Sequence, residues 1–118
     1  MNIPVTPVPK PRMTKSDKWK KRPATTRYWE FKDELLSHVK GNLEPVFQVT
    51  FYIPMPKSWT NKMRTEKNGT PHKQKPDVDN FLKAFMDCLC DDDSYIYDVR
   101  ARKFWAEKGS IELEETTM

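Results

Sequence analysis

The sequence predicts a small single domain of the α/β (α+β) class, with a mixed sheet of three or four strands and two main helices. Three observations support this prediction. The chain has 118 residues, which is the size of one domain with one modest core. The run VFQVTFYI is rich in β-branched and aromatic residues, as a buried strand is. The later run NFLKAFMDCL repeats its apolar residues at the period of a helix.

The first half of the chain is expected to form a strand, a helix and a second strand. A short strand at residues 3–8 is weakened by two prolines, and a basic, Pro-rich loop over about residues 9–25 follows it. A threonine pair then caps a helix over residues 25–39, which Gly41 ends. The strongest strand covers residues 45–53, and its alternation turns four side chains toward the core: Phe47, Val49, Phe51 and Ile53.

The second half begins with a long, polar and basic loop over about residues 54–75. A helix with one apolar stripe follows the loop. Period-two alternation then predicts a strand over residues 95–105, and a turn at Lys108-Gly109 leads to a last strand at residues 110–113. The expected order is therefore β-α-β-α-β-β within one domain over residues 1–118. The stripe of the helix consists of Phe81, Leu82, Phe85, Met86 and Leu89.

Charge is divided sharply along the chain. The formal net charge is +4, yet residues 77–98 carry seven Asp and one Lys, or −6. The first 76 residues carry 16 Lys and Arg against six Asp and Glu, or +10, and the last 20 residues carry four of each. The basic part favours a polyanionic partner, nucleic acid first. A merely solvated basic surface is the alternative interpretation.

The acidic part predicts a metal site. If the segment Asp77-Val78-Asp79 is extended, its two carboxylates point to the same side, roughly 6.5–7 Å apart. Carboxylates this close repel unless a cation or a proton lies between them, and hard oxygen ligands suit Mg²⁺ or Mn²⁺. The aspartates at 91–93 follow a helix of about 15 Å, so they join the first pair only if the chain doubles back.

Each acidic feature also has a purely structural interpretation. Asp77 and Asp79 can cap a helix, Asp79, Lys83 and Asp87 can form a solvated ladder, and the DDD run can be a turn. Lys83 can equally steady a carboxylate or contact a phosphate. Taken together, the features favour a metal site. An EF-hand is a poor fit, because the D-x-D-x-D-G pattern is missing. A zinc site fits less well still, because the usual paired spacings are missing among its candidates, Cys88, Cys90, His38 and His72.

Membrane and secretory functions are not expected. No apolar run approaches the roughly 20 residues that a membrane span needs, and the N-terminus lacks an apolar signal segment. Cys88 and Cys90 lie two apart on the expected helix and face different sides. Reduced thiols in the cytoplasm are therefore expected rather than a mutual disulfide.

The stretch HKQKPDVDNFLKAFMDCL followed by DDSYI resembles the RusA family of Holliday junction resolvases of bacteria and their phages. The shared pattern is a basic residue and Pro, then D-x-D-N, a Lys three residues on, an apolar helix carrying an Asp, and D-D-S before a strand. The segment VPKPRMTK also resembles the basic segment after the family's first strand. The matching positions are Lys75, Pro76, Asp77, Asp79, Asn80, Lys83, Asp87, Asp92, Asp93 and Ser94.

The resemblance implies a homodimeric, Mg²⁺-dependent endodeoxyribonuclease, with Mn²⁺ as a possible substitute and no small-molecule cofactor. It implies paired, symmetric nicks in branched DNA, the four-way junction, during recombination and repair. Asp77, Asp79 and one of Asp92 and Asp93 are then the catalytic, metal-binding carboxylates, with Asp93 preferred for the third place. Lys83 matches the catalytic lysine of the family. The short segment before D-D-S leaves the choice between Asp92 and Asp93 open.

The basic residues then neutralise DNA phosphates without reading sequence. Two other functions remain possible from the sequence: a non-catalytic nucleic-acid-binding adaptor, and a metal-dependent nuclease for flaps or forks. The residues predicted to bind nucleic acid are Lys10, Arg12, Lys15, Lys18, Lys20, Lys21, Arg22, Arg27, Lys73 and Lys75.

Overall fold

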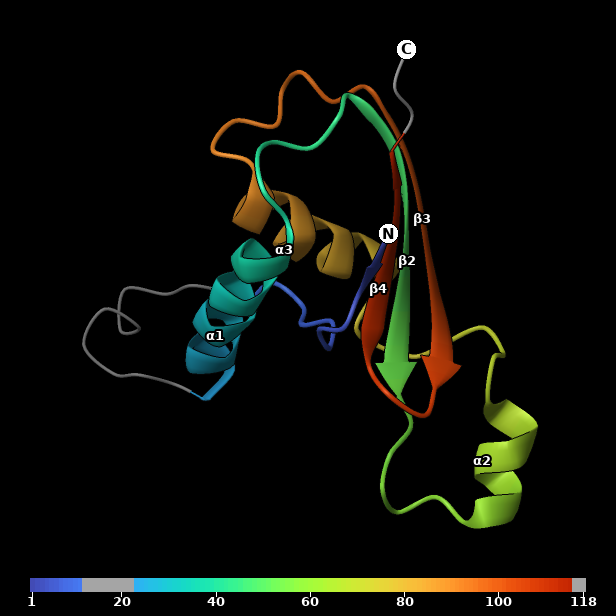
Figure 1. The fold of residues 1–118 in the computed structure, drawn as a ribbon. Coiled ribbons are helices and arrows are strands. Elements are labelled where there is room, and N and C mark those ends of the chain that lie inside the picture. Colours follow the sequence, from blue (N-terminus) through green and yellow to red (C-terminus); the bar gives the residue numbers. More distant parts are fainter. Residues whose placement is uncertain (12–22, 116–118) are drawn as a thin grey trace.

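A mixed four-stranded sheet organises the molecule (Figure 1). The structure is a computed structural model that describes residues 1–11 and 23–115. The strand order is β1-β4-β2-β3, with β2 parallel to β3 and antiparallel to β4, and β1 antiparallel to β4. The predicted α+β class is confirmed. The elements are β1 Asn2–Ile3, α1 Pro23–His38, β2 Val46–Pro54, α2 Asn61–Lys67, α3 Val78–Leu89, β3 Asp98–Ala106 and β4 Ser110–Glu115.

Helices α1 and α3 lie side by side on one face of the sheet (Figure 1). The inner face of β2 meets α3 there, because alternation points Phe47, Val49 and Phe51 toward the helices and buries all three. Phe85 of α3 is fully buried between two of them, with ring centroids 6.2 Å from Phe47 and 6.0 Å from Phe51. The apolar side chains whose patterns predicted β2 and α3 therefore pack together in one core.

The amphipathic pattern of α3 is confirmed. Phe81, Phe85 and Leu89 are buried, while Leu82 and Met86 pack partly buried against the same core. The predicted free thiols are confirmed as well, since Cys88 and Cys90 are both buried and are not joined in a disulfide.

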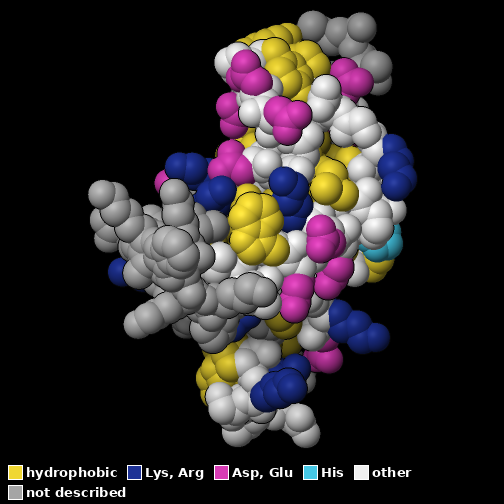
Figure 2. Space-filling model, turned by 90° about the vertical axis from the view of Figure 1, so that its left-hand side faces the viewer, with side chains coloured by type: hydrophobic (Ala, Val, Ile, Leu, Met, Phe, Trp, Pro, Cys, Tyr) yellow, Lys and Arg dark blue, Asp and Glu magenta, His cyan; other side chains and the backbone are white. Residues whose placement is uncertain are grey.

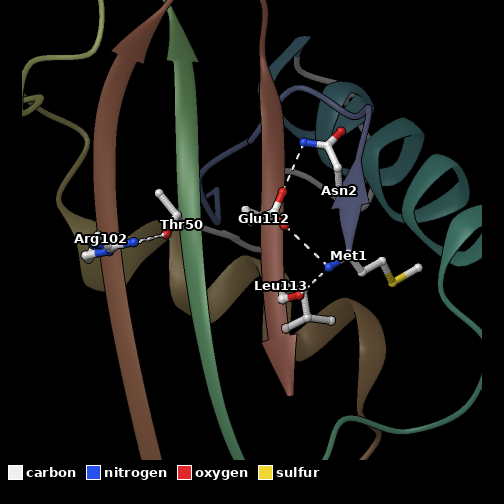
Figure 3. A network of polar contacts seen from close by, with 6 residues as sticks. All are labelled: Met1, Asn2, Thr50, Arg102, Glu112 and Leu113. Carbon is white, nitrogen blue, oxygen red and sulfur yellow. Dashed lines mark hydrogen bonds and ion pairs between the residues drawn. The ribbon is translucent and has the colours of Figure 1, made fainter. Parts of the chain in front are cut away.

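The opposite face of the sheet carries polar contacts between strands (Figure 3). Arg102 of β3 donates from Nη2 to the hydroxyl of Thr50 on β2 at 3.1 Å, and Thr50 is 2% exposed. At the edge of the sheet formed by β1 and β4, the amino group of Met1 donates to the carbonyl of Leu113 at 2.9 Å. Asn2 donates to the carboxylate of Glu112 at 3.1 Å. These contacts fasten β1, although it is only two residues long.

Two predicted boundaries in the first half were wrong. The first strand covers Asn2–Ile3 rather than residues 3–8, because Pro4 has no N–H to donate to a neighbouring strand. The first helix begins at Pro23, ahead of the threonine pair. Proline suits a first helical turn, where its missing N–H has no intrahelical partner. Thr25 therefore lies inside the helix, 8% exposed, and does not cap it.

The strand predicted to start at residue 95 starts at Asp98 instead. The amide of Ile96 donates to the carbonyl of Asp93 in a turn, at 3.1 Å. The amides of Tyr97 and Asp98 then converge on the carbonyl of Pro45, just before β2. Pairing with β2 begins only there. The last strand and the turn before it form where they were predicted.

The segment predicted to be a loop over about residues 54–75 contains a helix, α2, so the prediction was wrong for this part of the chain. Residues 56–75 form what we call the α2 arm, which extends beyond one end of the sheet (Figure 1). The hydroxyl of Thr60 caps α2 by accepting from the amide of Met63, and α2 buries no residue. A seven-residue helix without an apolar stripe has no periodicity to reveal it.

The α2 arm is attached to the edge of β3. The amide of Gly69 donates to the carbonyl of Trp105, the amide of Trp105 donates to the carbonyl of Thr70, and the amide of His72 donates to the carbonyl of Lys103. The ring of Trp105 lies 4.8 Å from that of Trp59 and 4.3 Å from that of His72, centroid to centroid. Residues 69–72 thus lie along the edge of β3 at residues 103–105, with a bridge between Pro71 and Phe104.

Replacing Phe85 with alanine should destabilise the fold by about 3–5 kcal/mol, because the substitution leaves a cavity between β2 and α3. Urea unfolding measures the change. Tyr97→Ala is the matched control, since that ring is 69% exposed and its loss should change stability by less than about 0.5 kcal/mol. Similar losses in both variants would contradict the core described above.

His72 should make the fold sensitive to mild acid. The side chain is 4% exposed, and its Nδ1 has no hydrogen-bond partner among the described residues. Burial and the charge of Lys103 lower the pKa of His72. The stability that the neutral ring provides is therefore present above about pH 6.5 and is lost as the pH falls below it.

The measurement is the midpoint of thermal unfolding between pH 8 and pH 5 for the natural protein and for His72→Phe. The natural protein should lose more stability than the variant below about pH 6.5. Parallel curves for the two proteins would exclude a neutral, buried His72.

Candidate active site

Two predicted carboxylates lie at the N-terminal end of α3. Asp77 is the N-cap residue and Asp79 lies in the first turn, and both are exposed. The side chain of Asp77 makes no capping hydrogen bond and joins no ion pair among the described residues, which leaves its oxygens available to another ligand. The helix begins at Val78, and the fully extended geometry considered from the sequence is not the one that forms. The partial positive charge of a helix N-terminus favours ionised carboxylates at this place.

Lys103 of β3 holds the turn that leads into these carboxylates. Its ammonium group donates to the carbonyls of Gln74 and Pro76, the latter at 2.7 Å. Burial lowers the pKa of Lys103, and the nearby charge of Asp77 opposes that shift. Lys103 therefore ties the acidic turn to the sheet while it places a positive charge next to Asp77.

Sequence reasoning missed Lys103, although one observation could have found it. Alternation along β3 places Lys103 on the same side as Val99 and Ala101, which pack against the core. A lysine at a core-facing position needs a partner for its charge. That requirement points to a polar group beneath α3, and the turn before Asp77 supplies it.

Lys10 was predicted to contact phosphate, and the structure gives it another environment. Its ammonium group lies 3.2 Å from the carboxylate of Asp87 on α3 and donates to the hydroxyl of Tyr28 on α1 at 3.1 Å. Burial opposes the charge of Lys10, but the hydrogen bonds to Tyr28 and Asp87 outweigh it and raise the pKa. The amide of Lys10 also donates to the carbonyl of Asn80. Lys10 therefore fastens the N-terminal segment to the helix that carries the carboxylates.

The ladder that Asp79, Lys83 and Asp87 can form is not among the ion pairs of the described residues, and Asp87 pairs with Lys10 instead. Lys83 is exposed on α3 and takes part in no ion pair within the described residues. Its ammonium group lies one turn from Asp79 and is available to a phosphate at the same end of the helix.

The candidates for the third carboxylate lie at the other end of α3. The helix has 12 residues, about 18 Å, and it separates Asp92 and Asp93 from the first pair. The strand after them pairs in parallel with β2 from its first residue, and only its later part, at Lys103, comes back to the turn before Asp77. Asp92 and Asp93 therefore stay at the other end of α3. In residues 1–11 and 23–115, no three Asp, Glu, His or Cys side chains are close enough to hold a metal ion together.

The loop after α3 has its own contacts. The carboxylate of Asp92 accepts from the amide of Ser94 at 3.0 Å, and the hydrogen bonds from Ser94 lower the pKa of Asp92. The hydroxyl of Tyr95 donates to the carbonyl of Leu43 at 2.6 Å. Burial and the contact with Cys90 raise the pKa of Tyr95 to about 12. These contacts hold the aspartates of this loop near the start of β2.

Figure 2 views the molecule from the side of its helices, where two groups of acidic side chains lie with basic side chains between them. Lys73 and Lys75 are exposed immediately before the acidic pair, and Arg27 is exposed on α1. The other basic residues predicted for the segment after β1 lie outside the described residues: Arg12, Lys15, Lys18, Lys20, Lys21 and Arg22. No described helix has the length and hydropathy that crossing a membrane requires.

A small α+β domain with free carboxylates beside exposed lysines has the groups that a phosphodiester-binding or phosphodiester-cleaving protein needs. Residues 3–114 match the family model described as Endodeoxyribonuclease RusA. The chain therefore belongs to the RusA endodeoxyribonuclease family, as the motif around Asp77 predicted.

A curated relative from Bacillus subtilis (strain 168), described as "Uncharacterized protein YqaN", is 38% identical to the chain over 73 residues. The similar region covers 55% of this chain and 51% of the relative, so the match spans about half of that protein's length. No solved structure matches the chain significantly.

Replacing Lys103 with methionine should loosen the turn before Asp77. Two carbonyls lose their donor, which should cost about 1 kcal/mol in global stability and raise amide hydrogen exchange selectively around residues 73–80. Lys103→Arg keeps a cationic donor and should preserve most of the protection. Lys108→Met, at an exposed turn, is the matched control. Unchanged exchange in Lys103→Met would contradict the positioning role of Lys103.

Proposed function

We propose that the chain is a divalent-metal-dependent endodeoxyribonuclease that resolves four-way DNA junctions in recombination and repair. The observation that carries this proposal is the pair of free carboxylates at the start of α3, Asp77 and Asp79, within a motif of the RusA family. Paired, symmetric nicks by a homodimer are part of the proposal, since a junction offers two equivalent strands. A cytoplasmic location is part of it as well.

The carboxylate pair fits a divalent cation in its chemistry. Both side chains are exposed, Asp77 has no capping partner, and hard oxygen donors are the ligands that Mg²⁺ and Mn²⁺ prefer. Asp93, with Asp92 as the alternative, is proposed as the third carboxylate. Because Asp93 lies beyond the far end of α3, its role needs a test separate from that of Asp77 and Asp79.

The residues of the chain have distinct proposed roles at the scissile phosphate. A bound divalent cation would neutralise charge and activate the attacking water. Lys83 would contact a non-bridging phosphate oxygen, where negative charge grows in the transition state. Lys73 and Lys75 would orient the DNA backbone just before the carboxylates. Lys103 would keep Asp77 in place from below.

A second candidate function is a DNA-binding module that does not cleave. One observation favours it, namely that only Asp77 and Asp79 share the start of α3, while Asp92 and Asp93 lie beyond its other end. In that case Asp77 and Asp79 only terminate α3, and the lysines alone contact DNA. A nuclease that prefers flaps or forks is the remaining alternative, and substrate choice in one assay separates the three.

Asp79→Asn should abolish cleavage while leaving junction binding nearly intact. Synthetic four-way junctions, forks and linear duplex are incubated with and without Mg²⁺. The natural protein should nick the junction at paired positions only with the metal, and Asp79→Asn should be slower by about 100-fold or more. Asp33→Asn, on the exposed surface of α1, removes the same charge and should cleave normally.

The same assay assigns the third carboxylate by comparing Asp92→Asn with Asp93→Asn. If all of these proteins bind the junction and none cleaves any substrate, the nuclease proposal is wrong and the binding module remains.

A further inference from the structure

The α2 arm carries positive charge that no ion pair among the described residues neutralises. Its basic side chains number six against the single acidic Glu66. Helix α2 buries none of its residues, so the arm adds little to the core. The two ion pairs within the described residues join Met1 to Glu112 and Lys10 to Asp87, away from the arm. The basic residues are Lys57, Lys62, Arg64, Lys67, Lys73 and Lys75.

The arm has a fixed shape despite its exposure. Trp59 packs on Trp105 at its base, and the side chain of Arg64 donates to the carbonyl of Pro56 at 2.8 Å, closing the arm on itself. Gly69 has a φ of +81°, a backbone conformation that lets the chain turn back toward β3. An element held in this way presents its charges without a large entropic cost on binding.

The arm also leads directly into the candidate active site. After the amide of His72 bonds β3, the chain passes through Lys73 and Lys75 and reaches Asp77. Lys103 fixes this last part from the same strand. Figure 1 shows the arm at one end of the sheet, with α2 well apart from α1 and α3. The basic residues of the arm therefore lead along the chain to the carboxylates.

We propose that the α2 arm is a contact surface for the phosphate backbone of duplex DNA next to the cleaved junction. The proposal rests on the proposed function for the identity of the polyanion as DNA. Exposed lysines contact phosphates without reading bases, so the arm should add affinity for any sequence. It adds Lys57, Lys62 and Lys67 to the residues that the sequence predicted to bind nucleic acid.

The test is the salt dependence of DNA binding without divalent metal, measured by fluorescence anisotropy on a four-way junction and on linear duplex. The arm variant is Lys62→Gln/Lys67→Gln, because glutamine keeps nearly the same helix propensity. The control is Lys40→Gln/Arg100→Gln, two exposed residues, the first just after α1 and the second on β3. Both variants remove two positive charges, so the formal net charge falls from +4 to +2 in each.

The arm variant should bind about tenfold more weakly near 0.1 M salt, and its slope of log affinity against log salt should fall by about 2. The control should change the slope by much less. Lys57→Gln, outside the helix, should lower the slope by about 1 and serves as a second variant that cannot disturb α2.

Three outcomes overturn parts of the account separately. If the natural protein binds neither DNA, the proposed function fails and the inference fails with it. If the natural protein binds and the arm variants match the control, the arm does not contact DNA while the proposed function stands. If the arm variants lose binding to the junction alone and keep the duplex affinity, a duplex backbone contact is wrong.

Discussion

The packing of α3 against the inner face of β2 is the constraint on which the rest of the molecule depends. Phe85 lies between Phe47 and Phe51, and this contact fixes the rotation of α3 about its axis. Because the apolar stripe faces the sheet, Asp79 and Lys83 must face outward. The same packing places the start of α3 near β3, where Lys103 reaches the turn before the helix. Site geometry is thus a consequence of core packing, and the lysine beneath the turn completes it.

The elements that could be predicted are those that bury one face, because burial makes their apolar residues recur at a regular period. The alternation of β2 and the stripe of α3 were both correct, because each pattern records which side chains leave water. Helix α2 could not be predicted, because it buries nothing and leaves no pattern. The carboxylate pair was found from its spacing in the sequence, whereas the contacts that Lys103 and Lys10 make around it could not be found in that way. Lys103 and Lys10 act through contacts 27 and 77 residues away in sequence, and only the tertiary structure brings those groups together.

The acidic and basic parts of the sequence are not separated onto different faces of the folded domain, since the helix-bearing face carries both. Acidic side chains gather in two groups on the helix-bearing side, with basic ones between them (Figure 2). One charged residue from the basic half, Lys10, neutralises one from the acidic half, Asp87, inside the fold. What remains is an acidic pair at one end of α3, reached through the basic α2 arm. The arm would attract an anionic polymer and the pair would repel it unless a cation were bound there, so the proposed DNA binding and the proposed metal binding should be coupled.

The most direct test of this account is where a divalent cation binds in the absence of DNA. Mn²⁺ is added to the isotope-labelled natural protein, and the paramagnetic broadening of each backbone amide is followed by NMR. The account predicts the strongest broadening at residues 77–81, at the start of α3. The loop at residues 91–94 lies about 18 Å away along the helix and should be broadened less. Broadening centred on that loop alone, or no selective broadening anywhere, would contradict the claim that Asp77 and Asp79 form the metal site.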